Sequence, residues 1–208
     1  MRVGREKKIP LAPEYHLIVT EGTQTEPLYF GEIKNIINGK FRDRIVLEIA
    51  GIGDNTENLF LKAKNLAQHS SAAIFRHVWL VFDKDDFPDE HFDRTVTLCE
   101  SSCTSETTWH ATWSNQCIEL WFLLHFSYLH ADLHRSEYWD KLTEHLKNLS
   151  AGNYYKNRKD LYNLLRPFME DAIRNARKLD EQNAGKPPSQ SSPGTKVYQL
   201  IEKIYPYL

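Results

Sequence analysis

Three acidic residues stand directly after two short apolar segments of the chain. Glu21 follows the segment YHLIVT (residues 15–20), and Asp83 and Asp85 follow HVWLVF (residues 77–82). Carboxylate oxygens are hard ligands that suit Mg²⁺ or Mn²⁺, ions that keep several waters and bind substrate phosphates. A single acid after a strand often only solvates a loop, whereas acids after two strands can converge on one pocket. This placement predicts a divalent-metal site suited to phosphoryl transfer.

Five residues near these acids are secondary candidates. Gly22 has no side chain, so a phosphate or a metal-bound water can approach that turn closely. Glu26 is either an outer ligand or an acid that favours the dipole of a helix beginning there. Asp86 is more typical of loop solvation. Asn115 and Glu119 are expected to begin a helix after a fourth strand, where they either complete the pocket or cap that helix.

The surrounding segments predict that the acids share one edge of a sheet. Apolar, β-branched segments predict strands, and apolar residues at helical spacing predict helices. The predicted strands are residues 15–20, 45–50, 77–82 and 107–113, and the predicted helices are residues 26–38, a segment around 59–67, and about 90–101. Alternating strands and helices imply mainly parallel pairing, so we expect an α/β core with a four-stranded sheet whose central strand is 77–82. Ligands of such sheets bind beyond the carboxyl ends of the strands, near the point where strand order reverses.

The last part of the chain predicts helices without strands. Residues 117–126 are expected to form a buried helix, 133–149 and 158–180 amphipathic helices, 184–194 a loop, and 195–204 a last helix. Trp139 and Phe168 are among the apolar residues expected to turn inward. We therefore divide the chain into a core, residues 1–130, and a helical C-terminal extension packed on it, residues 131–208.

Basic residues gather between residues 154 and 178. Basic side chains neutralise phosphates and tyrosines stack on unpaired bases, so this region is the expected nucleic-acid surface, although a solvated helix face explains it equally well. Its members include Lys156, Arg158, Lys159, Arg177 and Lys178, beside Tyr154 and Tyr155.

Composition narrows the class of protein. The formal net charge is -2, so nucleic-acid contact has to come from a local patch. The 3 cysteines are too few for a disulfide framework, and we found neither a signal sequence nor an apolar run of roughly 18 residues, so we expect a cytoplasmic protein without a membrane segment. Among 9 histidines, His130 and His134 have helical spacing but lack suitable partners, and we expect no zinc site. A P-loop ATPase is excluded because G-x-x-x-x-G-K-[ST] does not occur.

Two stretches carry a family resemblance. VTEGTQTEP (residues 19–27) and VWLVFDKDD (residues 78–86) resemble the E-G and D-x-D signature of Toprim domains, which occur in topoisomerases, primases and OLD-type nucleases. SNQCIELWFLLHF (residues 114–126) and GTKVYQLIEKI (residues 194–204) resemble the RloB family of Toprim-like proteins, so the resemblance covers nearly the whole chain. It implies a Toprim-like, Rossmannoid core.

The resemblance also implies roles and partners. Glu21 corresponds to the Toprim glutamate, a general acid/base or metal ligand, and Asp83 and Asp85 correspond to the metal-binding D-x-D. The RloB family is associated with bacterial defence loci and is often encoded beside an AAA-type ATPase. We therefore expect a Mg²⁺- or Mn²⁺-dependent nuclease effector of antiphage or abortive-infection defence, controlled by such a partner. The alternative is a non-catalytic subunit that retains the Toprim scaffold and serves as a nucleic-acid-binding or regulatory subunit.

Overall fold

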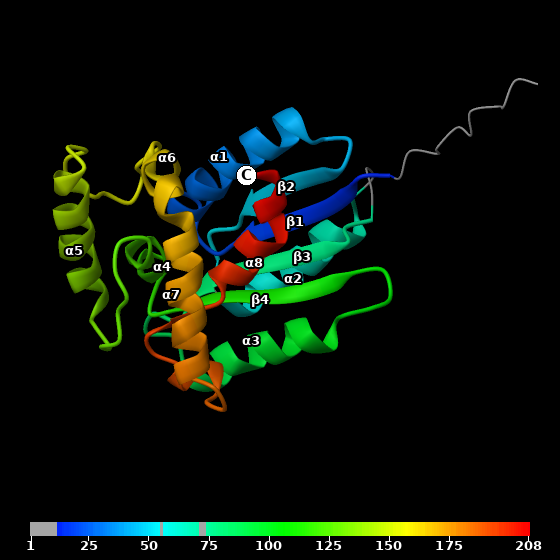
Figure 1. The fold of residues 1–208 in the computed structure, drawn as a ribbon. Coiled ribbons are helices and arrows are strands. Elements are labelled where there is room, and N and C mark those ends of the chain that lie inside the picture. The colour runs from blue at the N-terminus through cyan, green and yellow to red at the C-terminus, as the bar shows by residue number, and fades with distance from the viewer. Residues whose placement is uncertain (1–11, 55, 71–73) are drawn as a thin grey trace, which may run out of the picture.

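One mixed sheet forms the centre of the fold (Figure 1). The structure, a computed structural model, describes residues 12–54, 56–70 and 74–208. The sheet has 5 strands in the order β2-β1-β3-β4-β5, in which β1 to β4 are parallel and β5 is antiparallel to β4. The strands are β1 (Glu14–Thr20), β2 (Ile45–Gly51), β3 (His77–Asp83), β4 (Thr108–Asn115) and β5 (Gly194–Thr195).

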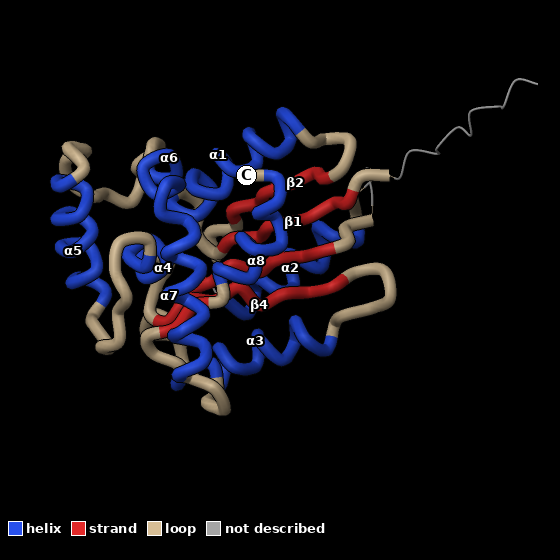
Figure 2. Tube along the Cα trace, viewed as in Figure 1, coloured by secondary structure: helices blue, strands red, loops and turns tan. Residues whose placement is uncertain are grey.

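Helices cover both faces of this sheet (Figure 2). One face packs against α2 and α3, and the other against α1, α8 and the helices between β4 and β5. Among the described residues, no helix has both the length and the apolar character needed to cross a bilayer. The helices are α1 (Thr25–Lys40), α2 (Thr56–Gln68), α3 (Asp89–Ser101), α4 (Glu119–Leu124), α5 (Arg135–Asn148), α6 (Leu161–Leu165), α7 (Met169–Gln182) and α8 (Val197–Ile204), with short 3-10 turns η1 (Arg166–Phe168), η2 (Pro188–Gln190) and η3 (Tyr205–Tyr207).

Alternating side chains along the central strands belong to two separate hydrophobic clusters, one on each face of the sheet. On β1, Val19 joins the cluster of α2 and α3, while Ile18 joins that of α1 and α8. On β3, Leu80 and Trp79 divide in the same way. Successive strand residues point to opposite faces, so a strand covered on both sides must be apolar throughout. This explains why the predicted central strand is the most apolar one, and β3 is the middle strand of the sheet.

The strand order creates a crevice at the carboxyl ends of β1 and β3. From β1 the chain crosses to β2 on one side and then returns to β3 on the other, so the order reverses between β1 and β3. The ladder continues one residue past β1, because the Glu21 backbone N–H donates to the Val81 carbonyl at 2.9 Å. The helices that follow the two strands leave on opposite faces, which opens a gap above these strand ends.

The fold corrects the expected sheet in one respect. The sheet is mixed and has a fifth strand, β5, in a segment that we expected to be a loop and the start of a helix. Two residues are too short for periodicity to reveal. Tertiary contacts define β5 instead, since Thr195 bonds the Ser114 hydroxyl at 2.9 Å and the Lys196 N–H donates to the Trp113 carbonyl at 2.8 Å.

The helical part also differs from expectation at two places. The helix expected at 158–180 is broken into α6, η1 and α7, with Pro167 in the middle turn, because proline cannot donate a backbone hydrogen bond to a helix interior. Trp139 does not turn inward and is 42% exposed. The buried stripe of α5 is Tyr138, Leu142 and Leu146 at four-residue spacing, and Trp139 lies about 100° away from it around the helix.

The helices after β4 share their hydrophobic cluster with the sheet. Buried residues of α4, α5, α6 and α7 belong to the same cluster as those of α1, β1 and β3. A buried polar contact joins two of these helices, because the Asn175 side-chain N–H₂ on α7 donates to the Leu124 carbonyl at the end of α4 at 2.8 Å. This carbonyl lies at a helix end, where intrahelical donors run out.

Replacing Asn175 by alanine should destabilise the protein by about 1–3 kcal/mol, because the Leu124 carbonyl would be left buried without its donor. Urea unfolding followed by circular dichroism measures this loss. Asn163→Ala, an amide-to-alanine change at an exposed position of α6, is the matched control and should change the unfolding free energy by less than about 0.5 kcal/mol. Equal effects of the two substitutions would contradict the assigned role of Asn175.

Candidate active site

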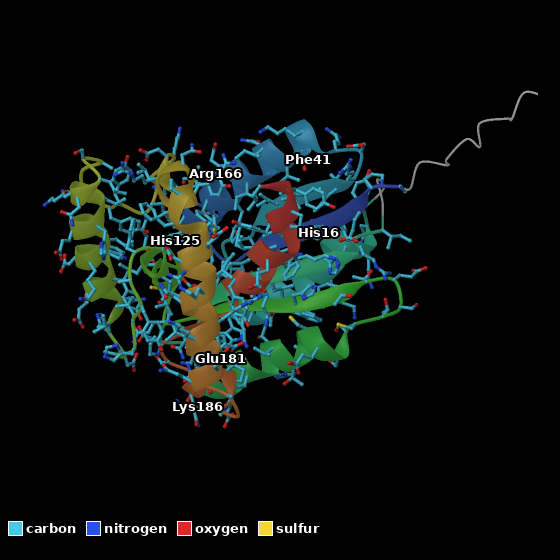
Figure 3. The ribbon with its side chains drawn as sticks, in the orientation of Figure 1. His16, Phe41, His125, Arg166, Glu181 and Lys186 are labelled. Atoms are coloured by element: carbon cyan, nitrogen blue, oxygen red, sulfur yellow. The ribbon has the colours of Figure 1, made fainter. Side chains whose placement is uncertain are left out.

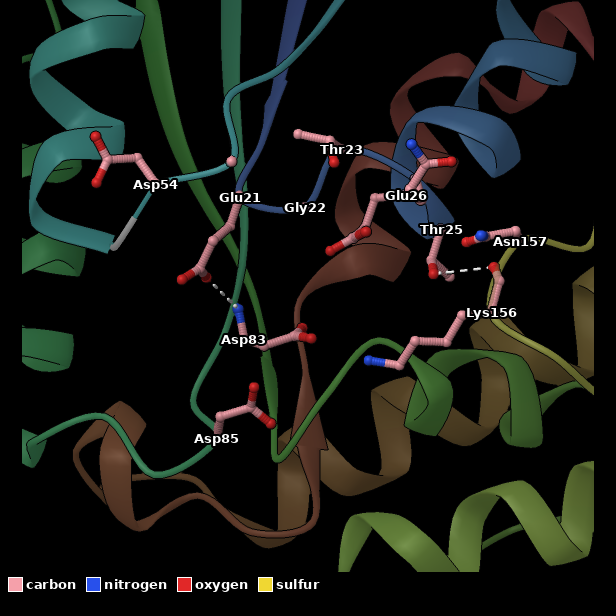
Figure 4. A pocket seen from close by; sticks show the side chains of 12 residues that line it. Glu21, Gly22, Thr23, Thr25, Glu26, Asp54, Asp83, Asp85, Lys156 and Asn157 are labelled. Atoms are coloured by element: carbon pink, nitrogen blue, oxygen red, sulfur yellow. Dashed lines mark hydrogen bonds between the residues drawn. The ribbon is translucent and has the colours of Figure 1, made fainter.

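A cavity of about 710 Å³ opens at the carboxyl ends of β1 and β3 (Figure 4). Glu21 lies just after β1, Asp83 is the last residue of β3, and Asp85 follows in the next turn. The three acids singled out from the sequence therefore line one cavity. The complete lining is Glu21, Gly22, Thr23, Gln24, Thr25, Glu26, Gly53, Asp54, Asp83, Asp85, Lys156 and Asn157.

Glu21 is held by two weak hydrogen bonds. Its Oε2 accepts from the Asp83 backbone N–H at 3.3 Å, and its Oε1 accepts from the Thr56 hydroxyl at 3.4 Å. Burial raises the pKa of Glu21 to about 7, the Asp83 N–H opposes this rise, and the charges of Glu26 and Asp85 add to it. A carboxyl with a pKa near neutrality can exchange a proton at physiological pH, which an ordinary glutamate does not.

The two aspartates of the D-x-D segment lie in different environments. Burial raises the pKa of Asp83 well above its usual range, and the negative charges of Glu26, Glu119 and Asp85 raise it further. Asp85 is exposed, has a left-handed φ of 38°, and accepts from Arg135 Nη1 at 2.9 Å. The ammonium of the residue between them, Lys84, donates to the Phe87 carbonyl at 2.5 Å, and both aspartates line the cavity.

Gly22 and Glu26 fit against one another. A Cβ on Gly22 would lie 2.4 Å from Glu26 Oε2, so only glycine allows this carboxylate to rest against the turn. Glu26 is in the first turn of α1, is only 6% exposed, and faces the cavity. Burial raises its pKa and the charge of Glu119 adds to the rise, whereas Lys156 lowers it. Glu26 thus occupies the helix N-terminus and lines the acid cavity, and its role as an outer metal ligand stays a prediction.

Of the described residues that line the cavity, Lys156 is the one lysine or arginine. Its backbone carbonyl accepts from the Thr25 hydroxyl at 3.0 Å, which fixes the loop before α6 against the start of α1. Figure 4 shows its ammonium group pointing into the space that Asp83 also faces. Asn157 lies beside it in the lining and was missed by sequence reasoning. The sequence of a loop does not indicate that the loop folds back over a strand end such as that of β1, which Asn157 follows by 137 residues.

Glu119 and Asn115 have separate surroundings. Glu119 is 2% exposed and accepts from the Tyr154 hydroxyl at 2.9 Å, and its charge acts on Asp83 from behind the cavity wall. Asn115 does not begin the next helix. It is the last residue of β4, and its side-chain N–H₂ donates to the Ser189 carbonyl at 3.0 Å, so it supports the neighbouring loop.

Tyr154 is buried with Glu119 and offers no face for a base, which corrects the expected stacking role.

The five basic residues expected to bind nucleic acid lie in different parts of the structure. Of these five, Lys156 alone lines the acid cavity. Arg158 is 8% exposed and is held by both carboxylate oxygens of Asp160, at 2.7 and 2.9 Å, so its guanidinium supports the loop. Arg177 pairs with Glu202 at 2.5 Å, and Lys178 lies 5.7 Å from the Tyr128 ring centroid, in a second hollow between α7 and α8. Lys159 and Asp86 are exposed, and Asp86 lies 3.6 Å from Arg135.

The chemistry of the acid cavity fits a hard divalent cation. Several carboxylates face one space, and burial raises the pKa values of Glu21, Glu26 and Asp83, with a further contribution from neighbouring negative charges in each case. Within the described residues, no three of these acids bring ligand oxygens within 4.8 Å of one another. An ion such as Mg²⁺ contacts one or two carboxylates directly and reaches others through its waters, so it does not require all of these oxygens in one tight cluster.

A different cluster lies at the opposite edge of the sheet. Glu14, His16 and His77 place ligand atoms within 4.8 Å of one another, close enough to hold a metal ion. His16 and His77 are register partners near the starts of β1 and β3, and Figure 3 shows His16 beside α8. Sequence reasoning missed this cluster because it searched for spacing within one segment. The available signal was a histidine near the start of each of two strands.

The hydrogen bonds of this cluster assign its protons. Trp79 Nε1–H donates to His16 Nδ1 at 3.2 Å, so a neutral His16 carries its proton on Nε2 and donates it to Glu14 Oε1 at 2.8 Å. A metal-binding imidazole needs the reverse arrangement, in which the second nitrogen donates. His77 Nδ1 is 2.9 Å from His110 Nε2. The geometry therefore suits a hydrogen-bonded cluster better than a metal ligand set.

A family model described as RloB, RloB-like protein, matches residues 16–204 of the chain. The match includes both strand ends that carry the acids, the buried α4 and the whole helical part up to the end of α8. No curated protein and no solved structure matches the chain. The chain belongs to the RloB-like family.

The histidine cluster makes a specific contribution to acid sensitivity. Burial lowers the pKa of His16 to about 4, whereas unfolding restores it to about 6.5, so the unfolded chain takes up the proton first as the pH falls. The contribution of His16 is fully present above pH 6.5 and is lost between pH 6.5 and 4, at about 1.4 kcal/mol per pH unit. His16→Gln should therefore lose less stability than the wild type over this range.

Urea unfolding at several pH values measures this difference. His130→Gln, which changes an exposed histidine, serves as the control and should keep the wild-type slope. His77 and His110, whose pKa values burial also lowers to about 4, remain in both variants along with Glu14 and Lys203, so the difference between slopes isolates His16. A Zn²⁺-dependent rise in melting temperature that His16→Gln abolishes would instead establish a metal site.

Proposed function

We propose that this member of the RloB-like family is a divalent-metal-dependent nuclease that cleaves nucleic-acid phosphodiester bonds at the acid cavity. The observation that carries the proposal is the convergence of Glu21 and Asp83 from two adjacent parallel strands at the point where strand order reverses. Ligand sites of open α/β sheets lie at such points. The E-G turn after β1 and the D-x-D turn after β3 further support a Toprim-like identity for the core.

The acids that would hold Mg²⁺ or Mn²⁺ are Asp83, Asp85 and Glu21, with Glu26 as an outer partner. When bound, the metal supplies Lewis-acid stabilisation of a phosphoryl transition state and a more acidic water. Asp85 has to leave or share Arg135 to take part, and its exposed position in the turn after β3 permits this. The close fit of Gly22 on Glu26 keeps that carboxylate near the others.

The chain's own groups suit phosphodiester cleavage. Glu21 lies close to the Asp83 backbone, where it would act either as a general acid or base or as a ligand of the metal. Lys156 brings a positive charge into an acidic cavity, where it can neutralise part of a substrate phosphate. The turn at Gly22 leaves room for the backbone to approach that phosphate.

The biological setting follows from the family resemblance. We propose a nuclease effector of bacterial antiphage defence that acts on DNA or RNA in the cytoplasm and is controlled by an AAA- or ABC-type ATPase. An acid cavity whose groups repel one another is a suitable target for such control, because a small rearrangement of one wall changes how many carboxylates a cation can reach. The alternative is a subunit that binds nucleic acid on this scaffold without cutting it.

Asp83→Asn and Glu21→Gln should each reduce nucleic-acid cleavage at least about 100-fold while leaving binding nearly unchanged, since they remove groups that act on the transition state. The assay measures cleavage of labelled DNA and RNA with Mg²⁺ or Mn²⁺, with the proposed ATPase partner supplied. Cell toxicity on co-expression gives a second readout.

Asp86→Asn is the matched control for this experiment. It removes an aspartate charge from the same turn at a side chain that is 95% exposed, and it should retain cleavage. Cleavage that survives both Asp83→Asn and Glu21→Gln would rule out the mechanism. Tight binding without cleavage by the activated wild type would favour the binding-subunit alternative.

Gly22→Ala tests the metal site without changing a charge. The added Cβ would meet the Glu26 carboxylate, which is flexible and must move away, so Mn²⁺ affinity should fall on the order of tenfold while the fold is retained. Calorimetric Mn²⁺ titration measures the affinity. Gly31→Ala on α1 is the control, because its Cβ would meet open space among the described residues. It should leave Mn²⁺ affinity unchanged, and undiminished affinity in Gly22→Ala would remove Glu26 from the site.

A further inference from the structure

We propose that Trp139 and Lys156 form a nucleotide subsite beside the acid cavity, in which an unpaired base stacks on the Trp139 indole and the adjoining phosphate contacts the Lys156 ammonium. This inference rests on the proposed nuclease function and names its substrate class, a strand that has unpaired nucleotides at the cleavage site. The observation behind it is a single lysine side chain that connects an exposed indole to the acid cavity.

Trp139 is unusual among the tryptophans of the chain. It is 42% exposed, whereas the other four of the 5 tryptophans are at most 9% exposed. It projects from α5 away from the buried stripe of that helix, which contains Tyr138 and Leu142. A single exposed aromatic residue is common at protein surfaces. The position of Trp139 distinguishes it, because Lys156 Nζ lies 5.4 Å from its ring centroid and the same lysine lines the acid cavity.

Three contacts fix the loop that places Lys156 between the indole and the acids. The Tyr154 N–H donates to the Thr143 hydroxyl on α5 at 3.2 Å, and the Tyr154 hydroxyl donates to Glu119 on α4 at 2.9 Å. The Lys156 carbonyl accepts from Thr25 on α1 at 3.0 Å. The loop backbone is therefore held in place before a ligand arrives, which reduces the conformational entropy lost on binding, and the Lys156 side chain is the part that has to move.

The chemistry of these two side chains suits a nucleotide. An indole face accepts any base by stacking, and a lysine ammonium attracts a phosphate. In the free protein the ammonium lies over the indole ring. A phosphate entering the cavity would draw this ammonium toward itself and uncover the ring for the base. Bases within a duplex are already stacked on their neighbours, so the subsite favours unpaired nucleotides.

Metal-free binding of a short oligothymidylate to the full chain tests this inference. In EDTA, the oligonucleotide should quench the tryptophan emission, because Trp139 is the accessible indole. Trp139→Leu should abolish the quenching and weaken binding roughly 5- to 150-fold, the range for loss of one stacked base. Lys156→Gln should weaken binding and make it less dependent on salt. A duplex of the same length should bind more weakly to the wild type.

Tyr205→Leu is the matched control, since Tyr205 is 38% exposed and lines the separate hollow between α7 and α8. It should leave oligonucleotide affinity unchanged. Equal affinity of the wild type and Trp139→Leu, equal binding of single strand and duplex, or no binding at all would overturn the subsite. Intact oligonucleotide binding combined with loss of ATPase association in Trp139→Leu would overturn it in favour of a protein contact.

This design separates the subsite from the nuclease proposal. Binding is measured without metal and does not require cleavage. If the wild type binds single strands with quenched Trp139 but does not cleave them with metal and the ATPase present, the nuclease proposal fails and the subsite stands. If cleavage depends on Asp83 but Trp139→Leu cuts single strands and duplexes as the wild type does, the subsite fails and the nuclease proposal stands.

Discussion

Repulsion among carboxylates gathered at one strand edge is the constraint on which the site depends. Glu21, Glu26, Asp83 and Asp85 line one cavity, and the charge of Glu119 also acts on Asp83. Burying a charge without a partner is costly, and the chain reduces this cost by raising the pKa values of Glu21, Glu26 and Asp83. The apolar clusters on both faces of the sheet stabilise the fold enough to keep these groups close. A cation placed among them would relieve the repulsion.

The strand order decides which acids meet. Glu21 and Asp83 are 62 residues apart in sequence, yet β1 and β3 are neighbours in register, so the residues that follow them lie side by side. The same pairing brings His16 next to His77 at the other edge. One sheet therefore places an acidic cluster at its carboxyl end and a neutral histidine cluster at its amino end. The two clusters differ in their interactions, since His16 donates a hydrogen bond to Glu14, whereas burial and neighbouring charges raise the pKa values of Glu21 and Asp83.

The sequence predicted the core because its signals are local. Apolar segments of six residues each predicted β1 to β3 to within one residue, and the acids after them indicated the cavity. Features that depend on distant contacts were not predictable in this way. β5 exists because Thr195 meets Ser114, and Asn115 supports a loop 74 residues later. Periodicity also could not separate Trp139 from the stripe of Tyr138, because one residue along a helix changes the face by about 100°.

The helical part contributes to the site as well as to the core. Lys156 belongs to the loop before α6, and Glu119 is the first residue of α4. Segments after β4 therefore supply the lysine that lines the cavity and the negative charge of Glu119 that acts on Asp83. The Tyr154 hydroxyl ties these two elements together by donating to Glu119. A displacement of this loop would move Lys156 away from the acids and remove the donor from Glu119 at the same time. Lys156 lowers the pKa of Glu26, and the charge of Glu119 raises the pKa of Asp83, so the position of the loop and the electrostatics of the acid site are physically coupled.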